Sequence, residues 1–478
     1  MANSEVGIGR TGKARDRTLF VDDRDIASSE GVERVIHPGK KHGGNPVLPP
    51  DQSWVDSLHI GGTVRLENGL YRIWYHGTGQ SGNFNLYADS EDGVHWMTPV
   101  LGQYEDDTGS LENNIYLSRV GLRSGDPAPP SVNQDVHPSI LYTPHMGEGR
   151  TYTLFSYDYG RSGYGAYDGY FLAFSEDGIC WTDGPEDPVI PGHADVGYFL
   201  YDERDGVFRA VVKDFLNIRG WRRRSVFWTE SDDAFDWSMP RAAIIPDLVD
   251  EEWAEGRDGH FTQFYGMPIV RYESMVLAFL QVFRCTDGEN STEGTIDIHL
   301  VSSRDGRHWQ RVGDRRAIIE RGEEGDWDWG IVRTGNSFVL DGDEIRAYYN
   351  GSNHSHAGRT PSGEPKTGAI GYVTCPRDRF VGIEAGRGGG EVRLTAQQAG
   401  GQLHVNADAA GGSLAVELAA DGGPVPGFGA ATCVSMTTDS LDHVVQWDGE
   451  RWPTQLGGRP VDVVVRLTDA ELFSLWWD

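Results

Sequence analysis

Apolar and polar residues alternate with a period of two in five separate stretches of the chain, as in strands that bury one face. These stretches are rich in aromatic and β-branched residues and lie at 70–75, 152–157, 207–212, 275–280 and 344–349. After a turn, each is followed by a further short apolar run, at 86–88, 171–174, 226–228, 299–301 and 370–373. The pattern predicts an all-β protein built from antiparallel hairpins.

A short phrase of the form Ser-x-Asp-Gly-x-x-Trp follows each of these apolar runs. Clear copies begin at Ser90, Ser175 and Ser303, a looser copy begins at Ser231, and a degenerate one begins at Cys375. The Asp-Gly pair supplies the positive φ that a tight turn needs, and the aromatic residue packs back on the sheet. A repeat of roughly 55 to 85 residues is typical of propeller blades. Five copies therefore predict a five-bladed β-propeller, and the turn aspartates Asp92, Asp177 and Asp305 are interpreted as structural.

Short outer strands are expected after the phrase, at 99–101, 188–190, 243–245 and 317–319. An isolated run at 45–48 resembles them, so we expect the N-terminal part to help complete the last blade and close the ring. From Gly388 the phrase is lost, and alternation continues at 391–394, 402–406, 413–418, 461–467 and 472–476. The sequence therefore predicts a disordered segment at 1–18, a propeller at 19–386 and a separate β-sandwich at 387–478.

Composition narrows the function classes. The chain has 72 acidic and 42 basic residues, a net charge of −30, which argues against nucleic acid and anionic membranes as partners. The start lacks the apolar segment of a signal peptide, and the four cysteines lie far apart with no Cys-x-x-Cys spacing. These features favour a cytoplasmic protein without a disulfide framework or a zinc motif. No P-loop, Gly-x-Ser-x-Gly or dinucleotide motif is present.

Several segments together resemble the superfamily of glycoside hydrolase families 32 and 43, in a bacterial branch similar to family 32. They include the Ser-Glu-Asp-Gly turns and the segments 19–23, 263–267, 294–297, 406–414 and 424–428. The resemblance extends from about residue 18 to the end of the chain. It implies a five-bladed propeller followed by a β-sandwich, and glycosidase chemistry in an axial funnel. The family's Trp-Met-Asn-Asp-Pro-Asn-Gly motif is absent, and 56–62 takes its place.

The resemblance implies three carboxylates on the innermost strands of the first three blades. Asp56 is the candidate for the first, Asp135 or His137 for the second, and Asp195 for the third, where a general acid is expected. Asp328 has the same position at the head of a later inner strand. Glycosidic cleavage needs a proton donor and a carboxylate that attacks or activates water. We therefore expect Asp135 and Asp195 to be catalytic, with Asp56 or Asp328 completing the set.

Other side chains are candidates for binding the sugar. Tyr265, Trp327 and Trp329 can stack on sugar faces, and Gln263 offers hydrogen bonds. Lys213 and the basic run 222–224 can hold an anionic sugar substituent or a phosphate, and equally can form salt bridges. His59 and His137 complete the predicted binding residues. Five histidines lie near predicted funnel loops without metal-binding spacing: His59, His76, His137, His260 and His354.

The leading hypothesis is a glycoside hydrolase acting on a small glycoside, most simply a fructofuranoside or arabinofuranoside. Phosphorolysis of a glycoside is the second hypothesis, with His59, Lys213 and the basic run as phosphate ligands. A glycan-binding propeller without catalysis is the third. No cofactor is expected, although the resemblance implies that an ion such as Ca²⁺ can sit in the axial channel. A small carbohydrate is the expected partner, and a homo-oligomer is left open.

Overall fold

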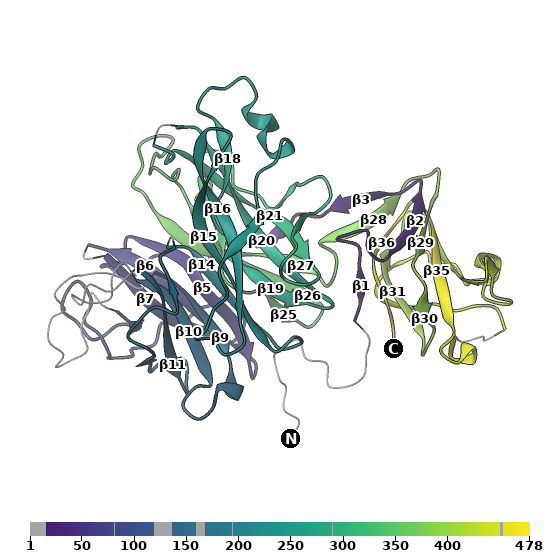
Figure 1. Ribbon diagram of the computed structural model, residues 1–478, viewed down its shortest axis with the longest axis horizontal. Coiled ribbons are helices and arrows are strands. Elements are labelled where there is room, and N and C mark those ends of the chain that lie inside the picture. The colour runs from purple at the N-terminus through teal and green to yellow at the C-terminus, as the bar shows by residue number, and fades with distance from the viewer. Residues whose placement is uncertain are drawn as a thin grey trace.

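The structure is a computed structural model that describes residues 16–80, 82–118, 136–158, 168–193, 195–288, 290–449 and 453–478. The described residues form β-strands and four short 3-10 helices, as the alternating pattern predicts. The helices are η1 (Pro144–Met146), η2 (Val249–Ala254), η3 (Ala430–Thr432) and η4 (Pro453–Leu456). Figure 1 shows two lobes, a larger one that carries β5 to β27 and a smaller one that carries β28 to β36.

Three separate antiparallel sheets begin the larger lobe, and each is built from consecutive strands. The first unit consists of β5 (Ser57–Glu67), β6 (Leu70–Gly79), β7 (Gly82–Ser90) and β8 (Ile115–Leu117). The second consists of β9 (Val136–Tyr142), β10 (Tyr152–Asp158), β11 (Gly169–Ser175), β12 (Thr182–Asp183) and β13 (Ile190–Pro191). The third consists of β14 (Gly197–Asp202), β15 (Val207–Ile218), β16 (Trp221–Ser231) and β17 (Arg241–Ile244).

An eleven-stranded sheet completes this lobe, and it divides into two units that share one parallel residue pair, Ile296 with Ile331. The fourth unit consists of β18 (Phe261–Phe264), β19 (Ile269–Tyr272), β20 (Met275–Cys285), β21 (Gly294–Ser303), β22 (Gln310–Arg311) and β23 (Ala317–Ile319). The fifth consists of β24 (Ile331–Thr334), β25 (Val339–Asp341), β26 (Glu344–Ser352), β27 (Gly368–Pro376) and β4 (Lys40–Lys41). All five predicted second strands are present, as β6, β10, β15, β20 and β26.

The N-terminal part of the chain does add to the last unit. β4 pairs antiparallel with β27, and Leu48 bridges to Ile370 further along the same strand. The predicted outer strand at 99–101 is wrong, however, because β8 pairs with β7 in the first unit. Near this point the chain bridges to β7 between Asp89 and Met97, and Leu101 packs against the core that contains Tyr87.

Apolar cores join the units in a fixed order. Each core takes side chains from two units, and the pairs are first with second, second with third, third with fourth, fourth with fifth, and fifth with first. In the last of these cores, Ile60 and Ile73 of the first unit pack with Tyr348 and Ile370 of the fifth. The burial of apolar side chains between neighbouring sheets is the main force that holds the five units together.

The repeated turns fasten each unit to the one before it. Trp74 Nε1 of the first unit donates to the Gly178 carbonyl of the second turn at 2.7 Å, and the Tyr348 hydroxyl of the fifth unit donates to the Gly93 carbonyl of the first turn at 2.7 Å. Phe155 of the second unit packs edge-on against Trp237 of the third turn, and Glu230 of the third unit pairs with Arg307 of the fourth turn. The interpretation of the turns as structural agrees with these contacts.

The fifth turn is altered in sequence but keeps its place. Asp378 stands where three of the other copies have glycine and the third unit has Ala234, and it holds a φ of +67°. It is 1% exposed and accepts hydrogen bonds from the Tyr272 hydroxyl of the fourth unit and from Ser474 and Arg17 of the smaller lobe. The turn therefore joins the fifth unit both to the fourth unit and to the smaller lobe.

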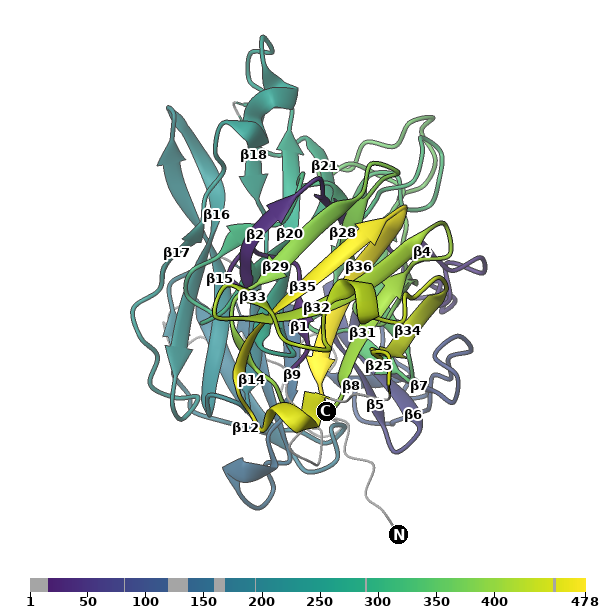
Figure 2. The ribbon, with the colours of Figure 1, turned by 90° about the vertical axis from the view of Figure 1, so that its right-hand side faces the viewer.

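The smaller lobe is a pair of six-stranded sheets around one apolar core. One sheet contains β1 (Thr18–Leu19), β3 (Glu33–Ile36), β28 (Val381–Ala385), β31 (Leu403–Asp408), β34 (Asp439–Val444) and β36 (Ala470–Trp477). The other contains β2 (Ile26–Glu30), β29 (Gly390–Leu394), β30 (Gln397–Gln398), β32 (Ser413–Ala420), β33 (Gly423–Pro424) and β35 (Pro460–Thr468). Figure 2 shows β2 beside β29 and β35 in this lobe.

The predicted domain boundaries need correction in this lobe. β1 pairs with β36, β2 with β29, and β3 with β28, so residues 18–36 complete the sheets of the C-terminal region. β28 also belongs here, which places residues 381–385 outside the five units. The pairing of N-terminal strands with the C-terminal region could not be predicted from the sequence, because strands far apart in the chain pair without any local signal. Residues 1–15 of the predicted disordered segment lie outside the described residues.

Candidate functional site

Charged side chains from the third and fifth units gather around the ring of Tyr265, which follows β18 in the fourth unit. Lys213 Nζ on β15 lies 4.5 Å from the ring centroid, and the guanidinium carbon of Arg224 on β16 lies 5.2 Å from it. The guanidinium carbon of Arg333, from β24 of the fifth unit, lies 4.3 Å away. Each cation faces an aromatic ring at a distance at which the two attract one another. We call these residues, together with Asp195 and His356, the Tyr265 cluster.

Backbone pairing sets the positions of Lys213 and Tyr265. The Lys213 N–H donates to the Val196 carbonyl at 2.8 Å, which extends the pairing of β14 with β15 by one step. Lys213 Nζ then reaches Asp195 Oδ1, just before β14, at 2.6 Å. The Tyr265 N–H donates to the Gln281 carbonyl on β20 at 2.9 Å. The site is thus built on strand ends rather than on a free loop, which favours a fixed geometry.

The electrostatics of Tyr265 reflect the three cations. Burial alone would raise the pKa of its hydroxyl, but Lys213, Arg333 and Arg224 together hold that pKa below its ordinary value of 10, against an opposing effect of Asp195. The cluster therefore favours negative charge at this position.

His356 fixes the direction of the hydrogen bond to Tyr265. Burial, and after it Arg333, Arg224 and Lys213, lower the pKa of His356 to about 3, so the ring is neutral near pH 7. His356 Nδ1 lies 2.8 Å from the Thr292 carbonyl, which can only accept, so Nδ1 carries the proton. Nε2 is then an acceptor, and the Tyr265 hydroxyl donates to it at 3.0 Å.

His59 lies near Arg333 of the cluster but adds no positive charge. Its ring stacks on His76 with centroids 4.9 Å apart, and its Nε2 lies 3.4 Å from Ser57 Oγ. Burial, His76, Arg333 and His354 hold the pKa of His59 well below its ordinary value. A neutral His59 imidazole can offer hydrogen bonds to a ligand, and its role in sugar binding stays a prediction.

Gln263 positions Arg224. Gln263 Oε1 accepts from the Arg224 backbone N–H at 2.8 Å and from its Nη1 at 3.1 Å, while Nε2 donates to Ser291 Oγ at 2.8 Å. The side chain is 0% exposed. Gln263 was predicted to bind substrate, and its buried contacts instead give it the role of holding a cation in place.

Asp328 does not join the Tyr265 cluster. It is 2% exposed, and its Oδ2 accepts from Lys41 Nζ at 2.7 Å and from the Tyr349 hydroxyl at 2.8 Å. Asp328 thereby ties β4 to β26, because its side chain turns toward the body of the fifth unit. These contacts give Asp328 a structural role, and its prediction as a catalytic residue stays untested.

The remaining predicted residues lie in several places. Asp56 is exposed just before β5, with its N–H bonded to the Thr78 carbonyl. Trp327 stacks on Tyr349 beside the core between the fourth and fifth units, and Trp329 lies 6.0 Å from the Arg359 guanidinium. Asp135 and the side chain of His137 lie outside the described residues.

Within the basic run, only Arg224 joins the Tyr265 cluster. Arg222 is exposed and stacks on Phe215, while Arg223 turns to the other face of β16 and pairs with Glu251 at 2.5 Å.

Sequence reasoning missed Arg333 and His356. Arg333 could have been found from the sequence, because it is a charged residue within the short apolar strand 331–334, whose other residues are buried. His356 lies in a loop without a motif.

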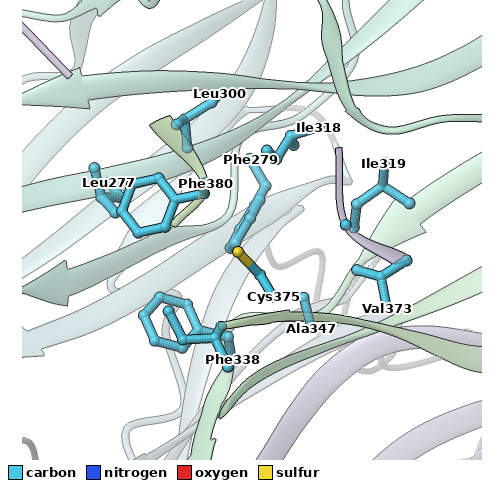
Figure 3. A pocket seen from close by; sticks show the side chains of 12 residues that line it. Leu277, Phe279, Leu300, Ile318, Ile319, Phe338, Ala347, Val373, Cys375 and Phe380 are labelled. Carbon is cyan, nitrogen blue, oxygen red and sulfur yellow. The ribbon is translucent and has the colours of Figure 1, made fainter. Parts of the chain in front are cut away.

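A separate cavity lies between the fourth and fifth units. Figure 3 shows its lining of Leu277, Phe279, Leu300, Ile318, Phe338 and other apolar side chains. A sugar placed there would leave its hydroxyl groups without partners, which is costly. The cavity therefore belongs to the core and is not a candidate sugar site.

Metal binding finds no support in the part of the chain that the structure describes. Within those ranges no three His, Cys, Asp or Glu residues are grouped so that they could hold an ion. The axial ion implied by the family resemblance stays a prediction. Among the described residues, no helix has the length and apolar character needed to span a membrane.

Comparisons with known proteins find similar solved structures only at low identity. No family model matches the chain, and no curated protein matches it. Three of the similar solved structures are 14% to 17% identical to it. An N-acetylgalactosamine deacetylase from F. plautii is 17% identical, over 73% of this chain and 97% of that one, with a TM-score of 0.47.

Two further structures come from Bacteroides. A glycosyl hydrolase from Bacteroides ovatus is 15% identical over 71% of this chain and 94% of that one, with a TM-score of 0.45. An endo-arabinase from Bacteroides thetaiotaomicron is 14% identical over 68% and 96%, with a TM-score of 0.40. With these identities and TM-scores, the function rests on this chain's own side chains, and membership of family 32 or 43 stays a prediction.

Proposed function

We propose that the chain is a glycoside-cleaving enzyme whose five units form a five-bladed β-propeller, with the reaction at the Tyr265 cluster. Support for the ring comes from the five shared cores, the last of which joins the fifth unit to the first. The first strands of the five units are then the innermost ones. The Tyr265 cluster takes residues from near three of these strands, β14, β18 and β24, as expected for a site on the ring axis.

The observation that carries the proposal is the carboxylate of Asp195 held by Lys213 beside an aromatic ring. Cleavage of a glycosidic bond requires a carboxylate that attacks the anomeric carbon or activates water, and a proton donor for the leaving oxygen. An ion-paired carboxylate suits the first role better than that of the general acid expected from the sequence. Tyr265 offers a flat surface for the apolar face of a sugar.

Asp135 is the proposed partner of Asp195. It directly precedes β9, as Asp56 directly precedes β5 and Asp195 stands just before β14. In this assignment Asp135 donates the proton to the leaving group, and Asp56 is the third carboxylate. A furanoside remains the substrate class that the family resemblance favours, and the proposed location is the cytoplasm.

Phosphorolysis is the second candidate, and the three cations of the cluster favour it. In that reaction phosphate replaces water as the acceptor of the glycosyl group, and Lys213, Arg224 and Arg333 would hold its charge.

A substrate panel tests the proposal. Aryl furanosides and aryl pyranosides, neutral and uronic, are incubated with the full chain with and without phosphate. We expect the parent chain to release the aryl alcohol and Asp195→Asn to release none. If the release depends on phosphate, the reaction is phosphorolysis rather than hydrolysis. If binding of sugars occurs with no cleavage in any arm, the chain is a glycan-binding protein and the enzymatic proposal fails.

A further inference from the structure

The Tyr265 cluster holds more positive than negative charge. Lys213, Arg224 and Arg333 approach one ring, and Asp195 is the carboxylate that pairs with a member of this set. The neighbouring Asp214 faces His193 instead, at 3.0 Å. With His356 and His59 neutral, the described side chains of the cluster leave two cations without a carboxylate.

The bonds of the two arginines show this directly. Arg224 Nη1 donates to the Gln263 amide oxygen at 3.1 Å and to the Ser291 carbonyl at 2.6 Å, both of which are uncharged acceptors. Arg333 makes no ion pair with any residue that the structure describes, and its Nε is buried without a hydrogen-bond partner there. A partly buried guanidinium without an anion costs free energy that an ion pair would offset.

Three other arginines of the larger lobe each pair with a carboxylate. Arg223, the direct neighbour of Arg224, pairs with Glu251, Arg209 pairs with Asp202 at 3.0 Å, and Arg311 pairs with Asp250. A chain with 72 acidic residues has ample carboxylates for such pairs. Arg224 and Arg333 differ from these three arginines and resemble Arg321, whose Nη1 donates to the Trp329 carbonyl at 2.6 Å and which has no ion pair among the described residues. What sets the cluster apart is that its two unpaired arginines face one ring together with Lys213.

We infer that the Tyr265 cluster binds an oxyanion that takes part in the proposed reaction. Arg224 and Arg333 supply paired N–H donors that match the oxygens of a carboxylate or phosphate, and Lys213 adds a point charge. This inference rests on the proposed function for its substrate, but the binding of an anion does not depend on cleavage.

The oxyanion has two possible sources with the same chemistry. It is either the carboxylate of a uronic acid residue within the substrate or free phosphate that enters as a second reactant. A binding experiment with separate arms distinguishes them. Glucuronate, galacturonate and inorganic phosphate are titrated into the full chain by calorimetry, with glucose and galactose as neutral controls.

Two variants of equal charge test the location. Arg333→Gln removes a cation of the cluster, whereas Arg241→Gln removes an exposed one from β17, the outer strand of the third unit. A lost charged hydrogen bond corresponds to roughly a tenfold or greater loss of affinity. We expect that loss for Arg333→Gln and unchanged affinity for Arg241→Gln. Arg333→Lys, which keeps the charge, should recover part of the affinity, and circular dichroism checks that each variant is folded.

The outcomes separate this inference from the proposed function. Uronate binding that requires Arg333 assigns the anion to the sugar, and binding of phosphate alone assigns it to a second reactant. Asp195→Asn should bind the anion more tightly, because a competing carboxylate is gone. Anion binding without cleavage of any glycoside leaves the inference standing and overturns the enzymatic proposal. Equal anion affinity in the parent and Arg333→Gln, or cleavage of neutral glycosides unaffected by Arg333→Gln, overturns the inference.

Discussion

The repeated turns and the Tyr265 cluster use charged residues in opposite ways. In the second turn, Asp177 Oδ1 accepts the backbone N–H groups of Ile179 and Cys180, each at 2.8 Å, and Ser175 Oγ accepts that of Gly178 at 2.8 Å. The carboxylate of the turn is thus stabilised by backbone N–H groups of the same turn. The cluster brings Lys213, Arg224 and Arg333 together and supplies one carboxylate to them.

This difference separates structural from functional charge. A carboxylate that accepts local N–H groups stabilises the same turn in every unit, so it can be repeated along the chain. A group of like charges destabilises the unit that holds it, and such groups are retained where a ligand compensates them. Repetition in this chain therefore marks the fold, and departure from repetition marks the candidate site.

The largest expected contrast lies between two Asp→Asn changes. Asp195→Asn should lower kcat/KM on the cleaved glycoside by about 10²–10⁴-fold, because it removes the carboxylate that takes part in the reaction. Asp177→Asn removes an equal charge from an exposed turn and keeps an oxygen acceptor, so kcat/KM should change less than about twofold. Steady-state kinetics on both variants measure the contrast. Equal losses of kcat/KM in the two variants would contradict the assignment of Asp195 to the reaction and of Asp177 to the fold.

Asp328 provides the next largest effect, in stability rather than in activity. Asp328→Ala leaves Lys41 Nζ and the Tyr349 hydroxyl without their shared acceptor, and we expect a loss of about 2–3 kcal/mol in the free energy of unfolding. Urea denaturation followed by tryptophan fluorescence measures it. The activity per folded molecule should match that of the parent chain. A loss of activity in fully folded protein would return Asp328 to the catalytic set.

A turn carboxylate should contribute less. Asp92 Oδ1 accepts the N–H groups of Val94 and His95 at 2.8 Å, so Asp92→Ala leaves two donors to water and should cost about 1 kcal/mol of unfolding free energy. Asp92→Asn keeps an acceptor and serves as the matched variant, with a smaller loss. Urea midpoints of the two variants give the comparison, and equal losses would show that the charge, and not the hydrogen bonds, stabilises the turn.

The smallest effect is a pH dependence of stability. Backbone N–H donors hold the pKa of the turn carboxylates Asp92 and Asp233 below the ordinary value of 3.8. Burial raises the pKa of Asp177 and Asp305, but the backbone N–H donors of their own turns outweigh it and hold the pKa below 3.8 there too. A carboxylate with a lowered pKa in the folded state stabilises it above the unfolded pKa, and this contribution is lost as pH falls through the folded pKa.

Thermal melts recorded at a series of pH values from about 6 to about 2 test this expectation. The melting temperature should be flat above about pH 4 and fall below it, and the fall should be shallower in Asp305→Asn than in the parent. A fall that begins near pH 6 would instead indicate histidine protonation as the cause.

Local pattern was enough to predict the strands and the turns. The five second strands start where alternation starts, because period two reports burial of one face directly. The side-chain environment was not predictable in this way. Asp195 and Asp328 both stand just before the first strand of a unit, yet one faces Lys213 near Tyr265 and the other faces Lys41 and Tyr349. Which way a strand-head residue turns depends on partners on other strands, which lie from 18 residues away, for Lys213 and Asp195, to 287 residues away, for Lys41 and Asp328.

The pairing of N-terminal strands in the smaller lobe has a consequence for limited proteolysis. The connection between β28 and β29 is the short stretch 386–389, and β2 pairs with β29 while β1 pairs with β36. A single cut in that stretch leaves two polypeptides, and the first still supplies strands to both sheets of the second. The nicked protein should therefore migrate as one species until it is unfolded. The two pieces are held by a noncovalent interlock of strands, and the connection at 386–389 is not what keeps them together.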